Sequence, residues 1–359
     1  MSNKVYKCLI ARVLQVIHEN ELSFKTVFQE FIQKTYSEVI SGKDLYYMLK
    51  FASQKLEKNI GVLNNINVFP VPDGDTGINM HQTFQSITRE LGTLRVKNHC
   101  GKIISAATKG AFLGSIGNSG IILAEYFRGL EQEWKNACTI DGNLFVRGLF
   151  AGARCAYQAV EKPREGTILT VARIIAETAN EWIKELTNPF ELLFIIFKEA
   201  KVALLDTHRI LPEANVAGVV DAGAIGLVLM FEGFIEAIVD KFPSTPLSSY
   251  TIDDDLVPFL KPKIDFSISE QEFEVILKVS GLKKPIDIFK FELKKEGSCL
   301  LVITNDSLSE IKIHIHCTNP DRIISKISEF VSHIEVESIK SLYEQKNQLS
   351  KRLKVKDGV

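Results

Sequence analysis

The chain has 359 residues, which is too long for one average core and predicts two or three domains. Its 43 basic and 44 acidic residues nearly cancel, so the composition excludes a global positive field that would recruit nucleic acid or an anionic membrane. An anionic ligand therefore has to be held by a local site. The six cysteines are dispersed, without a CxxC pair or disulfide-like spacing, which favours the reducing cytoplasm.

The first two thirds of the sequence are predicted to be helical. Residues 1–40 predict an amphipathic N-terminal helical extension rather than a targeting peptide, because they lack a compact apolar core and a small-residue cleavage site. From Ser41 to about Asp240, apolar residues recur at helical spacing in successive segments, and Ser41 is the expected first N-cap. Several segments carry Ala and Gly along one face, which lets helices approach closely. Residues 41–240 therefore predict an all-α domain, a bundle or barrel around one core.

One apolar stretch in this domain is long enough on paper to span a bilayer. It runs from Val219 to Val239 but contains three acidic residues. We interpret it as a buried helix of a soluble protein and predict no membrane span.

The composition changes after Asp240. Residues 241–265 are rich in Pro, Ser and Asp, which predicts a linker. Residues 266–359 contain short alternating or β-branched runs, typical of strands, and then a helix that Asn319 caps and Pro320 begins. The second domain is therefore predicted to be small and α+β, which makes the chain a multidomain protein.

The segment VPDGDTGINM, residues 71–80, contains the first candidate site. Asp73 and Asp75 flank a glycine on an irregular turn, where both carboxylates can face one centre and would repel if unpaired. An oxygen-preferring cation such as Mg²⁺ would hold them together, although a solvated acidic turn could have the same sequence. Thr76, Gly77 and Asn79 follow at an expected helix start, where free N–H groups can bind phosphate. A cation beside a phosphate cradle is what phosphoryl transfer needs, so the segment predicts Mg²⁺ with a nucleotide.

Three further expected helix starts are rich in Gly and polar residues: GSIGNSG at 114–120, EGTILT at 165–170 and AGVVDAGAIG at 217–226. Close packing or capping explains each one alone, and none is a Walker A loop. Four such starts in one helical domain favour a ligand rim at one end of the bundle. With Met80 from the first segment, the candidate nucleotide-binding residues are Gly117, Asn118, Ser119, Gly120, Thr167, Thr170, Asp221 and Gly223.

These four motifs together resemble a known family. LNNINVFPVPDGDTGINM, GNSGIILAEYFRG, EGTILTVARIIAE and AGVVDAGAIGLVLMFEGF are similar, in this order, to the DhaL-type domain of dihydroxyacetone kinases. They are more similar to the ATP-binding subunit of bacterial fatty acid kinase. The resemblance continues more weakly through EIKIHIHCTNPDRII, which is similar to that subunit's middle domain. It implies an eight-helix barrel whose rim binds ATP with Mg²⁺.

The resemblance also implies roles for single residues. Asp73 and Asp75 match two of three aspartates that hold the metal ions in dihydroxyacetone kinases. Asn67 falls at the third position, with one residue inserted, and its amide oxygen could ligate Mg²⁺ without supplying charge. The expected catalytic group is Asp73, Asp75 and Thr76, acting by positioning and charge neutralisation, and no general base is assigned. The phosphate contacts of the family fall on Thr76, Asn79, Ser119 and nearby glycines.

A histidine pair in the second domain suggests another metal site. His314 and His316 are two apart on an expected strand, so both rings lie on one face. This spacing suits Zn²⁺, but two structural histidines would have the same spacing. In the middle domain that the sequence resembles, such a pair shares its metal with a cysteine on a preceding strand. Glu272 takes that place here, and Cys317 should face the opposite side of the sheet.

The leading interpretation is a kinase subunit that transfers the γ-phosphoryl group of Mg-ATP to a fatty acid carboxylate. A DegV-like, fatty-acid-binding carrier protein would present the acid, and the acyl phosphate would serve phospholipid synthesis. The alternatives are a dihydroxyacetone-type kinase and a nucleotide-binding regulatory protein without turnover. The subunit that the sequence resembles has a third, C-terminal domain that engages the carrier, whereas this chain ends soon after the middle domain. The resemblance also suggests homodimerisation through the α+β domain.

Overall fold

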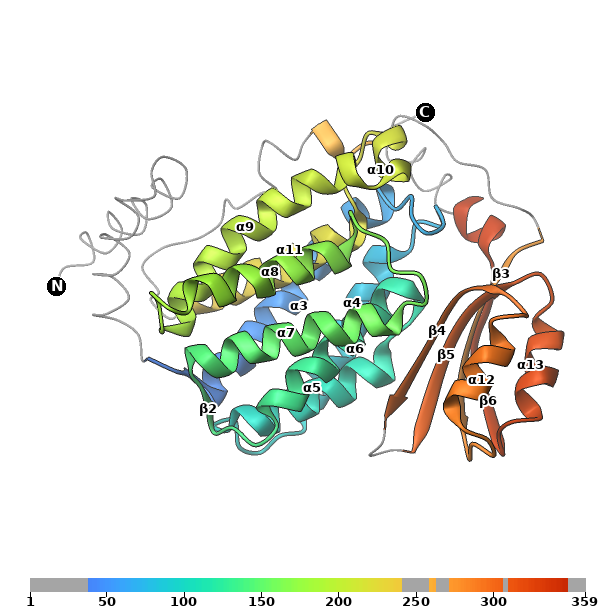
Figure 1. Ribbon diagram of the computed structural model, residues 1–359, viewed down its shortest axis with the longest axis horizontal. Helices are drawn as coiled ribbons and strands as arrows, with labels where there is room; N and C mark the ends of the chain where they lie inside the picture. The colour runs from blue at the N-terminus through green and yellow to red at the C-terminus, as the bar shows by residue number, and fades with distance from the viewer. Residues whose placement is uncertain (1–37, 241–257, 263–270, 306–308, 348–359) are drawn as a thin grey trace.

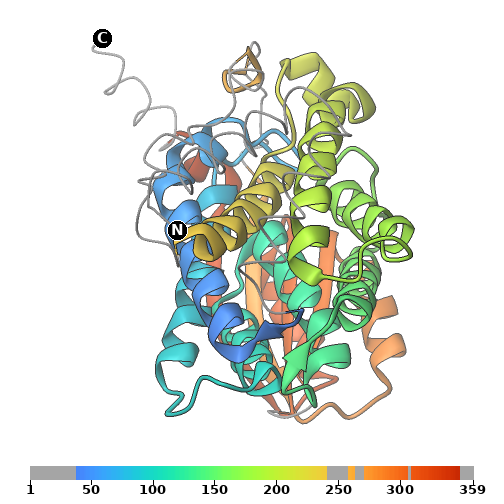
Figure 2. The same ribbon diagram turned by 90° about the vertical axis from the view of Figure 1, so that its left-hand side faces the viewer.

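The computed structural model describes residues 38–240, 258–262, 271–305 and 309–347. Residues 1–37 of the expected helical extension and most of the expected linker lie outside these residues. A helical unit lies beside a smaller unit that contains a sheet (Figure 1). In Figure 2, which looks from the helical side, the strands lie behind the ring of helices.

Eight long helices form a closed ring in residues 38–240. Each contacts the next along the chain, and the last contacts the first. In order they are α3 (Gly42–Asn65), α4 (Thr76–Gly92), α5 (Cys100–Gly114), α6 (Gly117–Trp134), α7 (Gly142–Ala159), α8 (Ile168–Trp182), α9 (Pro189–Ile210) and α11 (Ala222–Asp240). The short α10 (Pro212–Ala217) joins α9 to α11, and β1 (Ile40–Ser41) pairs with β2 (Thr139–Ile140). The predicted eight-helix domain is confirmed.

Local sequence explains where these helices begin and how closely they pack. Ser41 caps α3 in a reciprocal capping box with Asp44, as its sequence position predicted. A Cβ atom on Gly129 of α6 would lie 2.2 Å from the carbonyl oxygen of Ala151 on α7, so only glycine allows this approach. The small-residue faces are therefore contact surfaces between neighbouring helices.

The contact between α11 and α3 closes the ring. Lys55 of α3 forms ion pairs with Glu232 and Glu236 of α11, at 2.7 and 2.6 Å. The other side chains described on α11 are almost all buried apolar groups, as predicted for this segment. None of the helices in the described residues combines the length and the hydropathy that crossing a bilayer requires.

The second unit is a four-stranded antiparallel sheet with two helices on one face. The strands lie in the order β4-β5-β3-β6, with α12 and α13 on the side away from the barrel (Figure 1). Their bounds are β3 (Phe273–Ser280), α12 (Ile286–Leu293), β4 (Ser298–Asn305), β5 (Glu310–Cys317), α13 (Pro320–Ser328) and β6 (His333–Ser341). Asn319 caps α13 by accepting a hydrogen bond from the Arg322 N–H, as predicted. The predicted α+β character is thus confirmed.

The other face of the sheet packs on the barrel where α5 ends and α6 begins. Leu301 and Ile303 of β4 belong to the hydrophobic core of the helical unit. Lys312 of β5 is 1% exposed, and its ammonium group donates to the carbonyl oxygens of Leu113 and Ser115, at 3.1 and 3.0 Å. The sheet is therefore attached to the end of the barrel that carries the Gly-rich helix starts.

Candidate active site

The turn between α3 and α4 holds two carboxylates. Asp73 is 7% exposed, and Asp75 occupies the N-cap position of α4 without making a side-chain cap. Gly74 between them has a φ of 72°, which glycine adopts without steric strain. Asn67 donates its amide to Asp73 at 3.0 Å, and its oxygen accepts a hydrogen bond from the Thr76 hydroxyl. Asn67 therefore links Asp73 to Thr76 across the turn.

The two carboxylates are electrostatically unfavourable without a cation. Burial raises the pKa of Asp73 well above its usual value, and repulsion from Asp75 and Glu274 raises it further. Burial also raises the pKa of Asp75, against an opposing hydrogen bond with Asn79. One oxygen of Asp75, Oδ2, is buried without a hydrogen-bond partner among the described residues. Because a divalent cation would relieve both the repulsion and the orphaned oxygen, the turn fits Mg²⁺.

The first residues of α4 after Thr76 face the protein interior. The N–H groups of Gly77 and Ile78 donate to the Asn64 side chain, at 2.7 and 3.2 Å, so neither is free for a phosphate. Asn79 and Met80 are 2% and 0% exposed. Gly77, Asn79 and Met80 therefore support the turn from behind and do not line the cavity in front of it.

Two glycines bring α6 against α4. A Cβ atom on Gly117, whose φ is 61°, would lie 2.0 Å from the Asn79 amide nitrogen. One on Gly120 would lie 2.8 Å from the Thr83 hydroxyl. Gly117 and Gly120 thus act through close packing, whereas their neighbours Asn118 and Ser119 line the cavity.

One carboxylate joins the starts of α8 and α11. Oδ2 of Asp221 accepts hydrogen bonds from the N–H groups of Ile168 and Ala224, at 3.0 and 2.8 Å. Burial raises the pKa of Asp221 to about 6, although these two hydrogen bonds oppose the shift. Thr167 caps α8 by accepting from the Leu169 N–H at 3.3 Å. These polar groups fix the relative position of the two helix starts.

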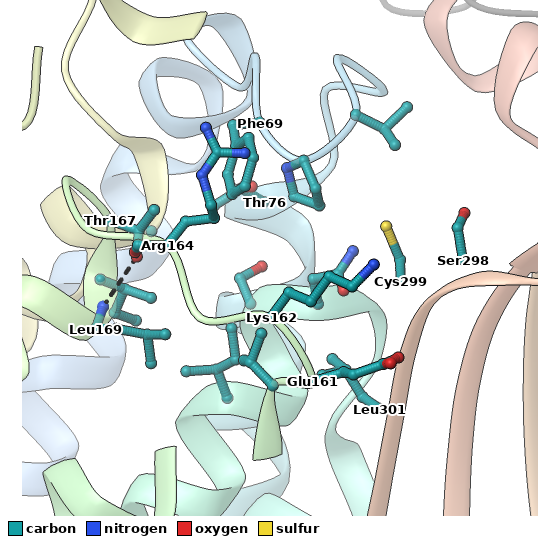
Figure 3. Close-up of a pocket in the computed structure, with 18 of the residues that line it drawn as sticks. Phe69, Thr76, Glu161, Lys162, Arg164, Thr167, Leu169, Ser298, Cys299 and Leu301 are labelled. Carbon is teal, nitrogen blue, oxygen red and sulfur yellow. Dashed lines mark hydrogen bonds between the residues drawn. The ribbon is translucent and has the colours of Figure 1, made fainter. Parts of the chain in front are cut away.

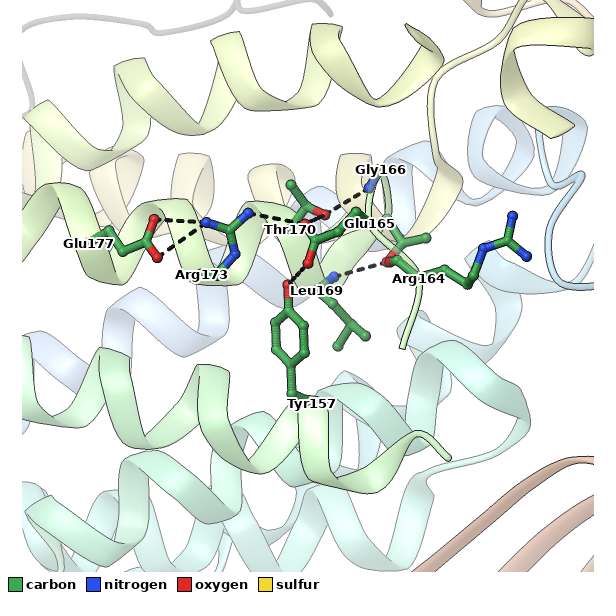
Figure 4. Close-up of polar contacts among 9 residues, drawn as sticks. Tyr157, Arg164, Glu165, Gly166, Leu169, Thr170, Arg173 and Glu177 are labelled. Carbon is green, nitrogen blue, oxygen red and sulfur yellow. Dashed lines mark hydrogen bonds and ion pairs between the residues drawn. The ribbon is translucent and has the colours of Figure 1, made fainter. Parts of the chain in front are cut away.

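Thr170 belongs to a polar network that fixes the loop before α8 (Figure 4). Its hydroxyl donates to Glu165 and accepts from the Gly166 N–H, both at 2.7 Å. Glu165 also accepts hydrogen bonds from Tyr157 at 2.7 Å and Arg173 at 3.0 Å. Thr170 therefore orders the loop and does not line the cavity.

The starts of α4, α6, α8 and α11 converge on one cavity of about 460 Å³ (Figure 3). The first residues of β4 form the opposite wall, so both units enclose the space. Of the residues predicted for metal binding and catalysis, the cavity is lined by Asn67, Asp73, Asp75 and Thr76. Of the remaining predicted nucleotide-binding residues, it is lined by Asn118, Ser119, Thr167, Asp221 and Gly223. Most of the predicted ligand rim is thus brought together in space.

Sequence reasoning missed several groups in this cavity. Lys162 and Arg164 lie directly before the EGT motif, and their charge beside a candidate phosphate site was a usable signal. Lys294, Ser298 and Cys299 come from the second unit and carry no local signal. Packing of the sheet on the barrel alone places them there.

A second buried cluster consists of Glu274, His314 and His316 on the barrel-facing side of the sheet. Their ligand atoms all lie within 4.8 Å of one another. Strand pairing places Glu274 opposite His316, so the prediction of Glu272 at this place was wrong by two residues along the strand. None of the four ring nitrogens has a hydrogen-bond partner in the described residues, and burial lowers the pKa of both histidines, to about 4 for His316. Neutral imidazoles with orphaned nitrogens beside a carboxylate fit a metal such as Zn²⁺.

Cys317 does not join this cluster. It lies on the opposite face of the sheet, in the hydrophobic core beneath α12 and α13, as predicted from strand alternation. Burial is the largest cause of the raised pKa values of Asp73 and Glu274. The charge of Glu274 raises the pKa of Asp73 further, and the charge of Asp75 raises the pKa of Glu274, which reaches about 7. The two candidate metal sites therefore interact electrostatically across the boundary between the units.

Comparison with known proteins identifies both units. Residues 70–236 match the DAK2 domain, and residues 270–349 match the FakA-like middle domain of fatty acid kinases. Protein YloV of Bacillus subtilis is 34% identical over 85% of this chain and 56% of its own length. Uncharacterised proteins of Staphylococcus saprophyticus and Staphylococcus aureus are 31% and 30% identical, over 87% of this chain and 57% and 58% of theirs. The chain thus spans little more than half the length of these relatives.

Among solved structures, the dihydroxyacetone kinase of C. freundii aligns with 54% of this chain and 34% of its own, at 17% identity and a TM-score of 0.38. The two matching families account for the helical unit and the sheet in turn, in the order that the sequence motifs indicated. The chain therefore carries a DAK2 domain followed by a FakA-like middle domain.

Proposed function

We propose that the protein binds Mg-ATP in the cavity between its two units and transfers the γ-phosphoryl group to a fatty acid carboxylate. The observation that carries this proposal is the convergence of four helix starts and two carboxylates, one buried and one half-buried, on one cavity. Among the four described helix starts, that of α6 has no side-chain cap, so its N–H groups remain available to phosphate, and paired carboxylates attract a divalent cation. The cavity volume of about 460 Å³ lies in the range of roughly 300–1,000 Å³ that small-molecule sites occupy.

The residues of the rim divide into two groups. Asp73 and Asp75 would hold Mg²⁺, with the orphaned Oδ2 of Asp75 as an available ligand atom. When bound, the ion would neutralise charge on the phosphates. Thr76, Asn118 and Ser119 would donate hydrogen bonds to phosphate oxygens. Asn67 could then offer its oxygen to the ion only if the Thr76 hydroxyl turned from it to a phosphate.

The chemistry of the cavity favours a carboxylate as the acceptor. A fatty acid carboxylate is already deprotonated at neutral pH, so its oxygen can attack the γ-phosphorus directly while the bond to the β-phosphate oxygen breaks and ADP leaves. An alcohol such as dihydroxyacetone must lose a proton to a base. No histidine lines the cavity among the described residues. Of its other acidic groups, Asp221 caps two helices and Glu161 lies 3.4 Å from Lys294. The absence of a free base therefore supports acyl phosphate formation.

The matching families support the same acceptor. The second unit matches the FakA-like middle domain of fatty acid kinases, although the chain covers little more than half of its relatives. A fatty-acid-binding partner protein would present the acid, because a long acyl chain is not free in water at useful concentrations. Glu274, His314 and His316 would hold Zn²⁺ beside the carboxylate turn, with one ligand position left over in a tetrahedral site.

Phosphoryl transfer from γ-labelled ATP with Mg²⁺ tests the proposal. The acceptors are dihydroxyacetone, free oleate, and oleate loaded on a fatty-acid-binding carrier protein from the same organism. We expect label in an acyl phosphate only with the loaded carrier. Labelled dihydroxyacetone phosphate would contradict the assigned acceptor. Tight ATP binding without any labelled acceptor would indicate a regulatory nucleotide-binding protein instead.

A further inference from the structure

The loop between α7 and α8, residues 160–167, is held in place along most of its length. Val160 forms an antiparallel bridge to Leu301 of β4, and Glu161 forms an ion pair with Lys294 at 3.4 Å. The first two loop residues are therefore attached to the second unit. Packing of the sheet on the barrel sets where this end of the loop lies.

The other end of the loop is attached to the barrel. Arg164 forms an ion pair with Glu213 at 3.2 Å and lies over the ring of Phe69, 5.4 Å from its centre (Figure 3). Glu165 accepts hydrogen bonds from three groups, among them Tyr157 and Arg173 (Figure 4). These contacts use the charges of Arg164 and Glu165 within the fold.

Lys162 differs from its charged neighbours. In the part of the chain that the structure describes, its ammonium group makes no hydrogen bond or ion pair, although Glu161 and Arg164 on either side of it do. Lys162 lines the cavity, and its side chain extends toward the wall formed by Cys299 and Ser298 (Figure 3). A rigid loop thus presents an unengaged cation inside a cavity that also contains Asp73 and Asp75.

An unengaged cation in this place is available to an anion from outside the fold. Asp73 and Asp75 are the acidic pair of the cavity, and a bound divalent cation would neutralise them. The remaining negative charge would lie on the nucleotide phosphates. A triphosphate whose inner phosphates lie on the uncapped start of α6 would direct its last phosphate toward the opposite wall, toward which Lys162 extends.

We propose that Lys162 binds the γ-phosphate and stabilises the charge on the phosphoryl group during transfer, an inference that rests on the proposed function. Lysine is a common partner of transferring phosphoryl groups, because its charge compensates that of the equatorial oxygens. The fixed loop holds the cation in place before the nucleotide binds, so little ordering is needed at the moment of transfer. Lys162 is therefore assigned a catalytic role.

Calorimetric titration of the full chain with Mg-ATP and with Mg-ADP tests this role. The variants are Lys162→Met and Lys162→Arg, with Lys102→Met as a control at the far end of α5, where the side chain is also exposed. We expect Lys162→Met to lower the affinity for ATP by about 10- to 100-fold, the usual effect of losing a hydrogen bond to a charged group. Affinity for ADP should change less than about 3-fold, because ADP lacks the γ-phosphate. Lys162→Arg should restore most ATP affinity, and Lys102→Met should match the unaltered protein.

Two results would overturn the role of Lys162 while leaving the proposed function intact. One is unchanged ATP affinity in Lys162→Met, and the other is an equal loss for ATP and ADP. Failure of the unaltered protein to bind either nucleotide would instead contradict the proposed function itself. Because Lys162 is exposed, the melting temperature of the ligand-free variant should equal that of the unaltered protein, which separates a binding defect from misfolding.

Discussion

Replacing Asp75 with asparagine is expected to stabilise the ligand-free protein and to abolish its stabilisation by Mg-ATP. Asp75 is a half-buried residue beside Asp73, its buried Oδ2 atom has no hydrogen-bond partner among the described residues, and desolvation raises its pKa. Asparagine keeps the size and polarity of the side chain but removes one of the two facing charges, and relief of an uncompensated charge should add about 1–3 kcal/mol to the free energy of unfolding. At about 2–4 °C per kcal/mol for a domain of this size, the melting temperature should rise by about 2–12 °C.

The unaltered protein should respond to ligand in the opposite way. At 100 times the dissociation constant, Mg-ATP should stabilise it by about 2.7 kcal/mol, whereas Asp75→Asn should show almost none of this gain. The assay is differential scanning calorimetry at pH 7.5, with and without Mg-ATP. Glu181→Gln is the control, because Glu181 is an exposed carboxylate outside the cavity.

The pH dependence provides an internal check. The folded-state pKa of Asp75 is raised, so its charge destabilises the fold only above the pH at which it ionises. The stability difference between the variant and the unaltered protein should therefore shrink as the pH falls toward 4. A variant that melts several degrees below the unaltered protein would refute the electrostatic reasoning. Full stabilisation of the variant by Mg-ATP would show that the cation binds elsewhere.

Three further predictions concern the surroundings of the cavity. The pKa of Asp221 is raised from 3.8 to about 6. The free energy of unfolding should therefore fall by about 3 kcal/mol as the pH rises from below 3.8 to above 6. Urea denaturation should show that Asp221→Asn removes this pH dependence. Lys312→Met leaves two backbone carbonyl groups without their donor and Glu337 without the ion pair that Lys312 forms with it at 3.0 Å, so it should cost about 1–3 kcal/mol and speed proteolysis between the units. Lys278→Met, at a more exposed ion pair, should cost less than about 1 kcal/mol. Zn²⁺ added to chelator-treated protein should raise its melting temperature. The variant His316→Ala, which removes one of three ligands, should show no such rise. An equal rise in both proteins would place the metal elsewhere.

The helix starts were predictable because their signals are local. The side chains of Ser41 and Asn319 accept hydrogen bonds from N–H groups three residues further along the chain. The Gly-rich motifs extend into the first turns of the helices that they were expected to open. Convergence of these starts on one cavity could be inferred because a closed ring of helices has only two ends. The positions of Asp73 and Asn118 in one cavity follow from this topology.

Other parts of the site depend on packing that a local motif does not encode. Gly77 and Met80 follow the acidic turn directly, yet the helical repeat turns both toward the interior. Glu272 was predicted at the position beside the histidine pair that Glu274 occupies. Residues two apart share a strand face, so only the pairing register distinguishes them. Ser298 and Cys299 reach the cavity because the sheet packs on the barrel, which is a contact between distant segments.

The central claim is that the cavity holds a nucleotide through a divalent cation on the carboxylate turn. Equilibrium dialysis of labelled ATP against the full chain, over a titration of Mg²⁺, tests it most directly. We expect one ATP to bind per chain, with an affinity that rises with Mg²⁺ and falls by at least about tenfold in Asp73→Asn. ATP binding of equal affinity without divalent cations, or unchanged binding in Asp73→Asn, would contradict it.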